Sequence, residues 1–254
     1  MPRKEDNVPA TLRAISVLEA LVAADRPASL AELTHSSRLP KPTLYRMLGM
    51  LESAGLVGRE PGARRYAPGP RLAALGRNVM LNGSLRAGRH AILARLVEAI
   101  GETCNFTMLD GAEVIYLDRV EAAWPLRMNL SSGSHVPLHC TASGKLLLAL
   151  LPKAARERLM AHLALTRYTD TTITDPKRLA AELTRIRVDR HATDNEEYHM
   201  GLVCVAVPVA DAKKRVCAAI AVHAPVSRMP LERALGHLPH LRRAADAMAA
   251  TFAG

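Results

Sequence analysis

The pattern of apolar and polar residues predicts two helices at the start of the chain. Residues 10–24 carry apolar side chains three or four positions apart, at Leu12, Ile15, Leu18, Leu21 and Val22, which is the spacing of one helical face. The segment Ser29-Leu30-Ala31-Glu32 has the form of a capping box, so a second helix is expected from there to about Ser36.

A third helix and a hairpin are expected next. The helix should open at Lys41-Pro42-Thr43, because a proline in the first turn of a helix loses no hydrogen bond, and Gly55 should close it in the left-handed conformation. Its apolar face comprises Leu44, Met47, Leu48 and Leu51. Residues 56–59 and 64–68 flank a Pro-Gly turn and predict a β-hairpin. Three helices followed by a basic hairpin are typical of a winged helix-turn-helix domain.

We assign residues 1–69 to this domain, 70–83 to a linker helix and 84–254 to a second domain. In the second domain, strand-like segments on both sides of Asp110-Gly111 predict a hairpin. The other expected elements are a strand at 126–130, helices at about 141–150, 153–163 and 176–188, strands at 202–209 and 216–222, and a closing helix at 230–252. The fold class is therefore α+β, and the second domain should hold a mixed or antiparallel sheet covered by helices.

Length and composition exclude several classes of protein. A chain of 254 residues with 49% hydrophobic and 23% charged residues fits two modest globular domains and excludes a disordered chain or a collagen. No apolar run approaches the ~18 residues of a membrane span, and the charged N-terminus shows no signal peptide. The four cysteines form no C-x-x-C pair, which argues against a zinc knuckle or a redox motif. Since no secretion signal is seen, we expect reduced thiols in a cytoplasmic protein.

The charge of the chain suits a polyanionic partner. The net charge is +10, and between Arg38 and Arg77 eight basic residues stand against two acidic ones, which gives this stretch alone a charge of +6. Aromatic residues make up only 3% of the chain, which argues against base stacking with single strands. Double-stranded DNA is therefore the expected partner.

Polar side chains off the apolar face of the third helix, together with the turn before it and the hairpin, are the candidate DNA contacts. Arg46 can pair with a guanine edge or a phosphate, while residues at the turn and helix start should meet the backbone. The candidate set is Arg38, Lys41, Thr43, Tyr45, Arg46, Arg64 and Arg65. The competing interpretation is a set of solvated charges on a small helical domain.

Three stretches resemble one protein family. They are SLAELTHSSRLPKPTLYRMLGMLESAGLV at 29–57, LHCTASGKLLLA at 138–149 and DNEEYHMGLVCVAVPV at 194–209. They are similar to the IclR family of bacterial transcriptional regulators, and the similarity runs from about residue 10 to 250. The chain departs from the family at Pro42, where many members have Ser, and at Ala142-Ser143, which replaces other small pairs.

The resemblance implies a ligand-responsive regulator, repressor or activator of a metabolic operon. It implies a GAF-like sensor domain that binds a small carboxylic or aromatic acid, and assembly as a homodimer or homotetramer. Carried over by position, it assigns the effector pocket to Met128, Val136, Ala142, Ser143, Asp194, Leu202 and Cys204.

The chemistry of these residues fits an acid-binding pocket. Residues 141–144 precede an apolar helix, and backbone N–H groups at a helix N-terminus favour an anion. Ser143 adds a hydroxyl, and Asp194 would accept from a ligand hydroxyl or repel a second acid group. Two simpler roles stay open, in which Ser143 is only a helix cap and Cys204 is only a core residue.

Other chemistry has weaker support. Gly144-Lys145 fails as a P-loop, because His139 and Leu146 occupy the positions of its Gly and Ser/Thr. His139 and Cys140 are adjacent and seldom face each other as a catalytic pair would. A metal would need His135, His139, His191 or His199 with Asp194 or Cys204. We expect no cofactor, no metal and no membrane partner. The alternative function is a small-molecule-binding enzyme or carrier with a basic N-terminal interaction module.

Overall fold

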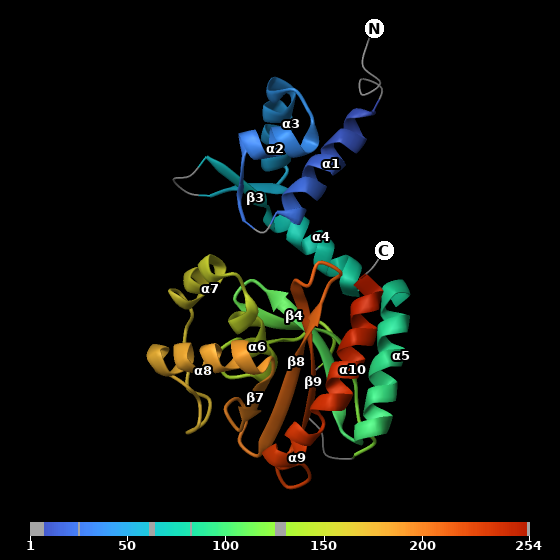
Figure 1. Cartoon of the computed structure of the whole chain (residues 1–254), viewed down its shortest axis with the longest axis vertical. Coiled ribbons are helices and arrows are strands. Elements are labelled where there is room, and N and C mark those ends of the chain that lie inside the picture. Colours follow the sequence, from blue (N-terminus) through green and yellow to red (C-terminus); the bar gives the residue numbers. More distant parts are fainter. Residues whose placement is uncertain (1–7, 25, 61–63, 82, 125–130, 253–254) are drawn as a thin grey trace. The chain divides into compact units, whose positions relative to one another are not determined.

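The computed structural model describes residues 8–24, 26–60, 64–81, 83–124 and 131–252, which form two compact units that divide between Met80 and Leu81 (Figure 1). The elements up to residue 81 are α1 Ala10–Ala23, β1 Ala28–Ser29, α2 Leu30–Ser37, α3 Lys41–Ser53, β2 Val57–Arg59, β3 Arg65–Pro68 and α4 Pro70–Leu81. Within the described ranges, no helix is both long and apolar enough to cross a membrane.

The first unit has the helices and the hairpin that the sequence predicts. Its α2 begins with a complete capping box, in which Ser29 Oγ accepts from the Glu32 N–H at 3.3 Å and the Glu32 carboxylate accepts from the Ser29 N–H at 2.7 Å. The apolar face of α3 is buried in the core of this unit, and Gly55 follows the helix with φ +73°. These local predictions are confirmed.

A short third strand in the first unit was not predicted. β1 pairs with β3, so that the small sheet has the order β1-β3-β2, with Ala28 opposite Tyr66. Two residues are too short to show an alternating pattern. The strand ties the base of the hairpin to the start of α2, which fixes the hairpin beside the helices.

The second unit is built on one antiparallel sheet of six strands in the order β6-β5-β4-β9-β8-β7. Its elements are α5 Gly83–Ile100, β4 Thr103–Asp110, β5 Glu113–Val120, β6 His135–Pro137, α6 Ala142–Leu150, α7 Lys153–Met160, α8 Pro176–Asp189, β7 Ala192–Asn195, β8 Leu202–Ala210, β9 Val216–Pro225, α9 Leu231–Gly236, α10 Leu238–Ala249 and the 3-10 turn Ala250–Phe252. α5 and α10 cover one face of the sheet, while α6 and α8 lie on the other (Figure 1).

Two predicted helices in the second unit were too long. The closing helix expected at 230–252 is divided into α9 and α10, because Pro239 lacks an N–H and its ring would clash with the carbonyl of Leu235 in a continuous helix. The helix expected at 153–163 ends at Met160, where His162 N–H bonds to the Leu159 carbonyl at 3.1 Å and tightens the last turn. The short strands β6 and β7 were not predicted, and the strand expected at 126–130 lies outside the described residues.

Small residues let α6 lie close to the sheet. Ala206, Ala219 and Ala221 are completely buried beneath it. Gly144 is required at the start of α6, because a Cβ there would lie 2.4 Å from the Leu138 carbonyl oxygen. This packing lays α6 across the sheet, against β4, β5, β7, β8 and β9.

Candidate functional site

A basic groove lies between α3 and the hairpin of the first unit. It has a volume of about 740 Å³ and is lined by Leu30, Lys41, Pro42, Tyr45, Arg59, Arg64 and Tyr66. Three of the candidate DNA contacts, Lys41, Tyr45 and Arg64, are therefore brought together. Tyr45 of α3 is 57% exposed. Exposing a large aromatic ring to water is unfavourable, which suggests that a partner covers it.

Arg59 also lines the groove. It belongs to the basic stretch of the sequence but was not among the predicted DNA contacts. Its guanidinium lies 3.1 Å from the Glu52 carboxylate, donates to Tyr66 Oη at 3.3 Å and stacks 5.1 Å from the Tyr66 ring centroid. The hydrogen bond with Tyr45 and the nearby Tyr66 and Glu52 raise the pKa of Arg59. Its position on the hairpin strand opposite Tyr66 could have indicated this contact, because cross-strand neighbours share a face.

The remaining candidate DNA contacts lie outside this groove. Arg38 is exposed at the end of α2 with φ +55°, and Thr43 and Arg46 project from α3 without lining the groove. Arg65 instead donates to the Pro27 carbonyl at 3.0 Å and lies 3.6 Å from Glu32. Its guanidinium therefore braces the hairpin against the start of α2.

The second unit holds a small inner cavity under the N-terminus of α6. Its walls are formed by Tyr116, Val136, Thr141, Ala142, Ser143, Asp194, Tyr198, Leu202, Cys204 and His223. Six of the seven predicted effector residues are thus brought together, and the seventh, Met128, lies outside the described residues. The free volume is only about 20 Å³, room for about one water molecule.

Thr141 is the residue that caps α6. Its Oγ1 accepts from the Gly144 N–H at 3.1 Å and donates to the Pro137 carbonyl at 2.7 Å. The interpretation of Ser143 as a simple helix cap is therefore wrong. Ser143 lies in the first turn of α6 and lines the cavity, beside backbone N–H groups that favour negative charge.

Asp194 brings a carboxyl group into the inner cavity from β7. Its Oδ1 accepts from the N–H groups of Glu197 at 2.8 Å and Tyr198 at 3.3 Å. Burial and the neighbouring Glu197 raise the pKa of Asp194 to about 7, against the lowering effect of these hydrogen bonds and of Lys145. The carboxyl group can therefore exist near neutral pH as a proton donor or as an anion.

A buried ion network anchors the loop that carries Asp194's hydrogen-bond donors. Lys145 of α6 is 1% exposed, bonds to the Glu197 carboxylate and lies 3.7 Å from Glu182 of α8. Burial raises the pKa of Glu197, while Lys145 lowers it. Thr172 Oγ1 also donates to the Glu197 carbonyl at 2.6 Å. The loop after β7 is thus fixed to α6, α8 and the segment before α8.

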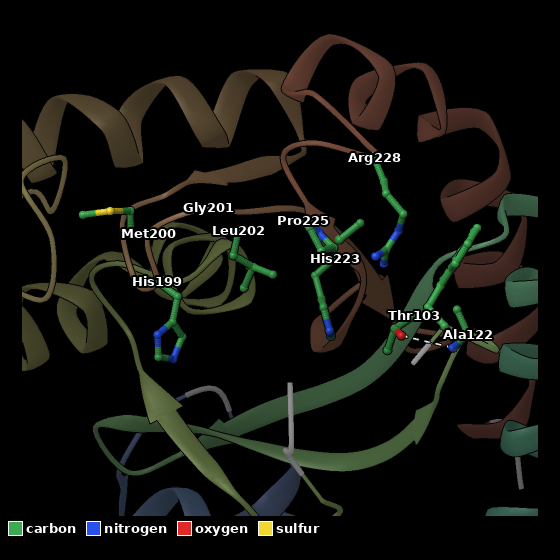
Figure 2. Close-up of a pocket in the computed structure, with 11 residues that line it drawn as sticks. Thr103, Ala122, His199, Met200, Gly201, Leu202, His223, Pro225 and Arg228 are labelled. Carbon is green, nitrogen blue, oxygen red and sulfur yellow. Dashed lines mark hydrogen bonds between the residues drawn. The ribbon is translucent and has the colours of Figure 1, made fainter. Parts of the chain in front are cut away.

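A larger outer pocket lies beside the inner cavity. It has a volume of about 310 Å³, and its walls are formed by Thr103, Ala122, Trp124, His199, Met200, Gly201, Leu202, His223, Ala224, Pro225 and Arg228 (Figure 2). Leu202 and His223 line both spaces, so these two side chains form the wall between them. No motif in the sequence marks this pocket, so it was not predicted.

The cysteines and histidines do not form a reactive or metal-binding cluster in the described residues, where no three metal-ligating side chains come together. Burial raises the pKa values of Cys140 and Cys204, which keeps both as thiols, and Cys204 serves as an apolar wall. His135 instead contacts Asp110 at 2.8 Å, and His139 bonds to the Thr166 carbonyl at 2.9 Å.

Both units match known protein families. Residues 10–61 match the IclR helix-turn-helix domain, and residues 78–250 match the bacterial transcriptional regulator IclR C-terminal domain. The chain is 51% identical over 243 residues to the "probable transcriptional regulator SauR" of Cupriavidus necator, a match that covers 96% of each chain.

Solved structures give the same result. The structure of the Thermotoga maritima IclR is similar with a TM-score of 0.64 and 28% identity, over 96% of this chain and 98% of that one. The inducer binding domain of a PobR double mutant from Acinetobacter, in complex with 3-hydroxybenzoic acid, matches with a TM-score of 0.58 and 26% identity, over 63% of this chain and 94% of that one.

Proposed function

Because this chain belongs to the IclR family and is a DNA-binding transcriptional regulator rather than an enzyme, we propose that it controls a metabolic operon in response to a small carboxylic or aromatic acid. The observation that carries this proposal is the inner cavity, where Ser143, Asp194 and the N-terminus of α6 converge. The acid shifts the protein between DNA-competent and incompetent states through its different affinity for each. Such a regulator works in the bacterial cytoplasm, where its operator is.

The DNA contacts follow from the exposed basic surface of the first unit. Arg46 is the proposed base reader on α3, with Thr43 beside it. Lys41, Tyr45 and Arg64 are proposed to hold phosphates in the groove, where Arg59 joins them. Arg38 and Arg65 are proposed to approach the backbone from the turn and the hairpin. These side chains lie at the surface of a unit rich in basic residues, with Thr43 and Arg65 partly buried.

The proposed ligand class follows from the walls of the inner cavity. Helix N–H groups and the Ser143 hydroxyl suit a carboxylate, while Val136 and Cys204 supply apolar walls. The 3-hydroxybenzoic acid bound by the PobR inducer domain is a ligand of the same class. Opening of the cavity would be needed for any such acid, since its present volume holds about one water molecule.

A homodimer is proposed from apolar residues that the first unit leaves exposed. On and before α1, Val8, Leu12, Ile15 and Val22 are each 41–55% exposed, and on α4 so are Leu75 and Val79, at 51% and 54%. Their spacing of three, four or seven places them along one face of each helix, a stripe that suits a second copy. Dimers also suit operators with two half-sites.

The double substitution Leu12→Asp and Ile15→Asp should weaken this dimer. We expect the dissociation constant to rise at least 30-fold, because two buried apolar contacts are each worth about 1 kcal/mol or more. Sedimentation velocity over a range of protein concentrations measures the shift, and Thr11→Asp, an exposed neighbour on the same helix, is the control. An unchanged dissociation constant would place the interface on another surface.

The proposed function is tested by a titration against DNA. The purified protein meets the DNA upstream of its own gene and a shuffled fragment of equal length, at about 0.15 M salt, with and without a panel of carboxylic and aromatic acids. We expect about a thousandfold preference for the natural fragment and a change of that affinity with at least one acid. Equal, salt-dependent binding to all genomic fragments, with no response to acids, would contradict the proposal.

The affinity for the acid should depend on pH through Asp194. Since its pKa is about 7 in the free protein, the carboxyl group is neutral below pH 7 and becomes a second negative charge beside a bound carboxylate above it. Affinity should therefore fall by up to about tenfold per pH unit from pH 7 upward. Calorimetric titration of the tightest-binding acid of the panel, at pH 6, 7 and 8, measures this slope.

Asp194→Asn isolates the effect. The amide oxygen still accepts from the Glu197 and Tyr198 N–H groups, so the loop should hold while the pH slope disappears. Asp170→Asn, at an exposed position, should leave the slope unchanged. DNA affinity without acid should be the same in all three proteins, and a loss of it in Asp194→Asn would show that Asp194 is structural.

A further inference from the structure

The outer pocket contains a braced cluster of polar side chains that the proposed function does not use. Arg228 donates through Nε and Nη2 to the two oxygens of the Glu102 carboxylate, at 2.8 and 2.9 Å. Its guanidinium lies 4.8 Å from the centre of the Trp124 ring, and Trp124 Nε1 donates to the Gly101 carbonyl at 3.0 Å. The cluster is therefore fixed in place before any ligand arrives.

Two hydrogen-bond donors of this pocket stay open. Within the described residues, no hydrogen bond engages Nη1 of Arg228. His223 is 6% exposed, and its Nδ1 lies 3.2 Å from the amide nitrogen of Asn105. With the Asn105 amide placed so that its nitrogen faces Nδ1, that nitrogen donates to Nδ1 and the ring proton is on Nε2. Figure 2 shows the guanidinium of Arg228 and the imidazole of His223 extending into the same space beside Pro225.

The outer pocket offers a second acid group one cation, Arg228, which is held in place by its pair with Glu102. None of the described residues that line the outer pocket is Asp or Glu, whereas the inner cavity holds Asp194. Glu102 raises the pKa of Arg228, which remains a cation. Burial and Arg119 lower the pKa of His223 to about 3, so its ring is neutral at every working pH.

We propose that the outer pocket binds a second acid group of the effector, between Arg228 and His223 and against the face of Trp124. The effector is then a small dibasic acid, with its first carboxylate in the inner cavity and its second beyond the wall formed by Leu202 and His223. The inner cavity has no room for a second acid group beside the first carboxylate and Asp194. This inference rests on the proposed function.

Trp124 provides a direct test, because it is the single tryptophan of the chain and lines the outer pocket. Its fluorescence, excited at about 295 nm, is followed as the full-length protein is titrated with succinate and glutarate and with the monoacids of equal length, butyrate and valerate. We expect a saturable change with at least one diacid, at a concentration at least tenfold below that of its monoacid.

Two variants of Arg228 connect the signal to the site. Arg228→Gln should abolish the advantage of the diacid, and Arg228→Lys, which keeps the charge but loses the bidentate contact with Glu102, should reduce it several-fold. The melting temperature of each variant is measured alongside. Arg242→Gln, at an exposed position on α10, should behave like the wild type. These variants separate loss of the second acid contact from a general loss of folding.

Three results would overturn the inference: equal responses to diacid and monoacid, a diacid advantage that survives both Arg228 substitutions, or no change in Trp124 emission up to about 10 mM of any acid. A different result would contradict the proposed function itself, namely that acids bind to the protein without changing its affinity for DNA. A monoacid that alters DNA affinity without changing Trp124 emission would support the inner cavity and contradict the role of the outer pocket.

Discussion

Lys145→Met is expected to destabilise the C-terminal unit by about 3–5 kcal/mol, the cost of breaking a buried ion pair by removing one partner. Methionine fills much of the lysine's space but leaves the buried Glu197 carboxylate without its cation. The charge must then stay uncompensated or take up a proton. Urea unfolding followed by circular dichroism measures the loss, provided that the C-terminal unit shows its own transition.

A second substitution distinguishes charge from packing. Lys145→Met combined with Glu197→Gln removes the unpaired charge, so the double variant should recover most of the lost stability. Lys153→Met is the matched control, since Lys153 is 80% exposed and its pair with Glu157 spans 3.9 Å, and its cost should be below about 0.5 kcal/mol. A double variant as unstable as Lys145→Met would show that the lysine acts through its contacts with α8.

The same network connects stability with ligand binding. Glu197 follows Asp194 by three residues, and its backbone N–H donates to the Asp194 carboxylate. A loop released from Lys145 would therefore lose one of the hydrogen bonds that hold Asp194 in the inner cavity. The buried lysine is therefore expected to contribute both to the stability of this unit and to its proposed response to acids.

Local sequence signals predicted the first unit well. The capping box at Ser29, the apolar face of α3 and Gly55 act within a few residues, so each is visible in the sequence. β1 was missed because two residues carry no periodicity, and its pairing with Tyr66 joins positions 38 residues apart. Pro239 is a local signal for the break between α9 and α10. It was overlooked because apolar residues continue at helical spacing on both sides of it.

The inner cavity was predicted through resemblance more than through chemistry. Its residues come from five strands, β5 to β9, from α6 and from two loops, and the order of these strands in the sheet does not follow from the chain. Lys145 shows what local patterns miss. Next to Gly144 it suggested only a phosphate-binding loop, which the neighbouring residues excluded. Its actual partner, Glu197, lies 52 residues away in the sequence. The outer pocket was missed for the same reason, because Trp124 and Arg228 meet only in the folded chain.

Arg46→Ala is the substitution expected to affect DNA recognition most. If Arg46 reads a base from α3, its loss should weaken binding to the operator by about 1–3 kcal/mol, roughly 5- to 150-fold, and should change binding to a shuffled fragment little. Arg46 is exposed on the side of α3 away from its buried face, so the fold should tolerate alanine. Fluorescence anisotropy with both fragments at one salt concentration measures the two affinities.

Arg59→Ala provides the contrast that makes this result interpretable. Arg59 lines the groove with Lys41 and Arg64, so its loss should weaken binding to both fragments equally and lower the slope of affinity against salt by about 1. Arg46 and Arg59 should therefore separate base reading from phosphate binding in one experiment. An equal loss on both fragments for Arg46→Ala would assign Arg46 to the phosphate backbone, and the base reader would then have to be sought among the partly buried Thr43 and the exposed residues of α3.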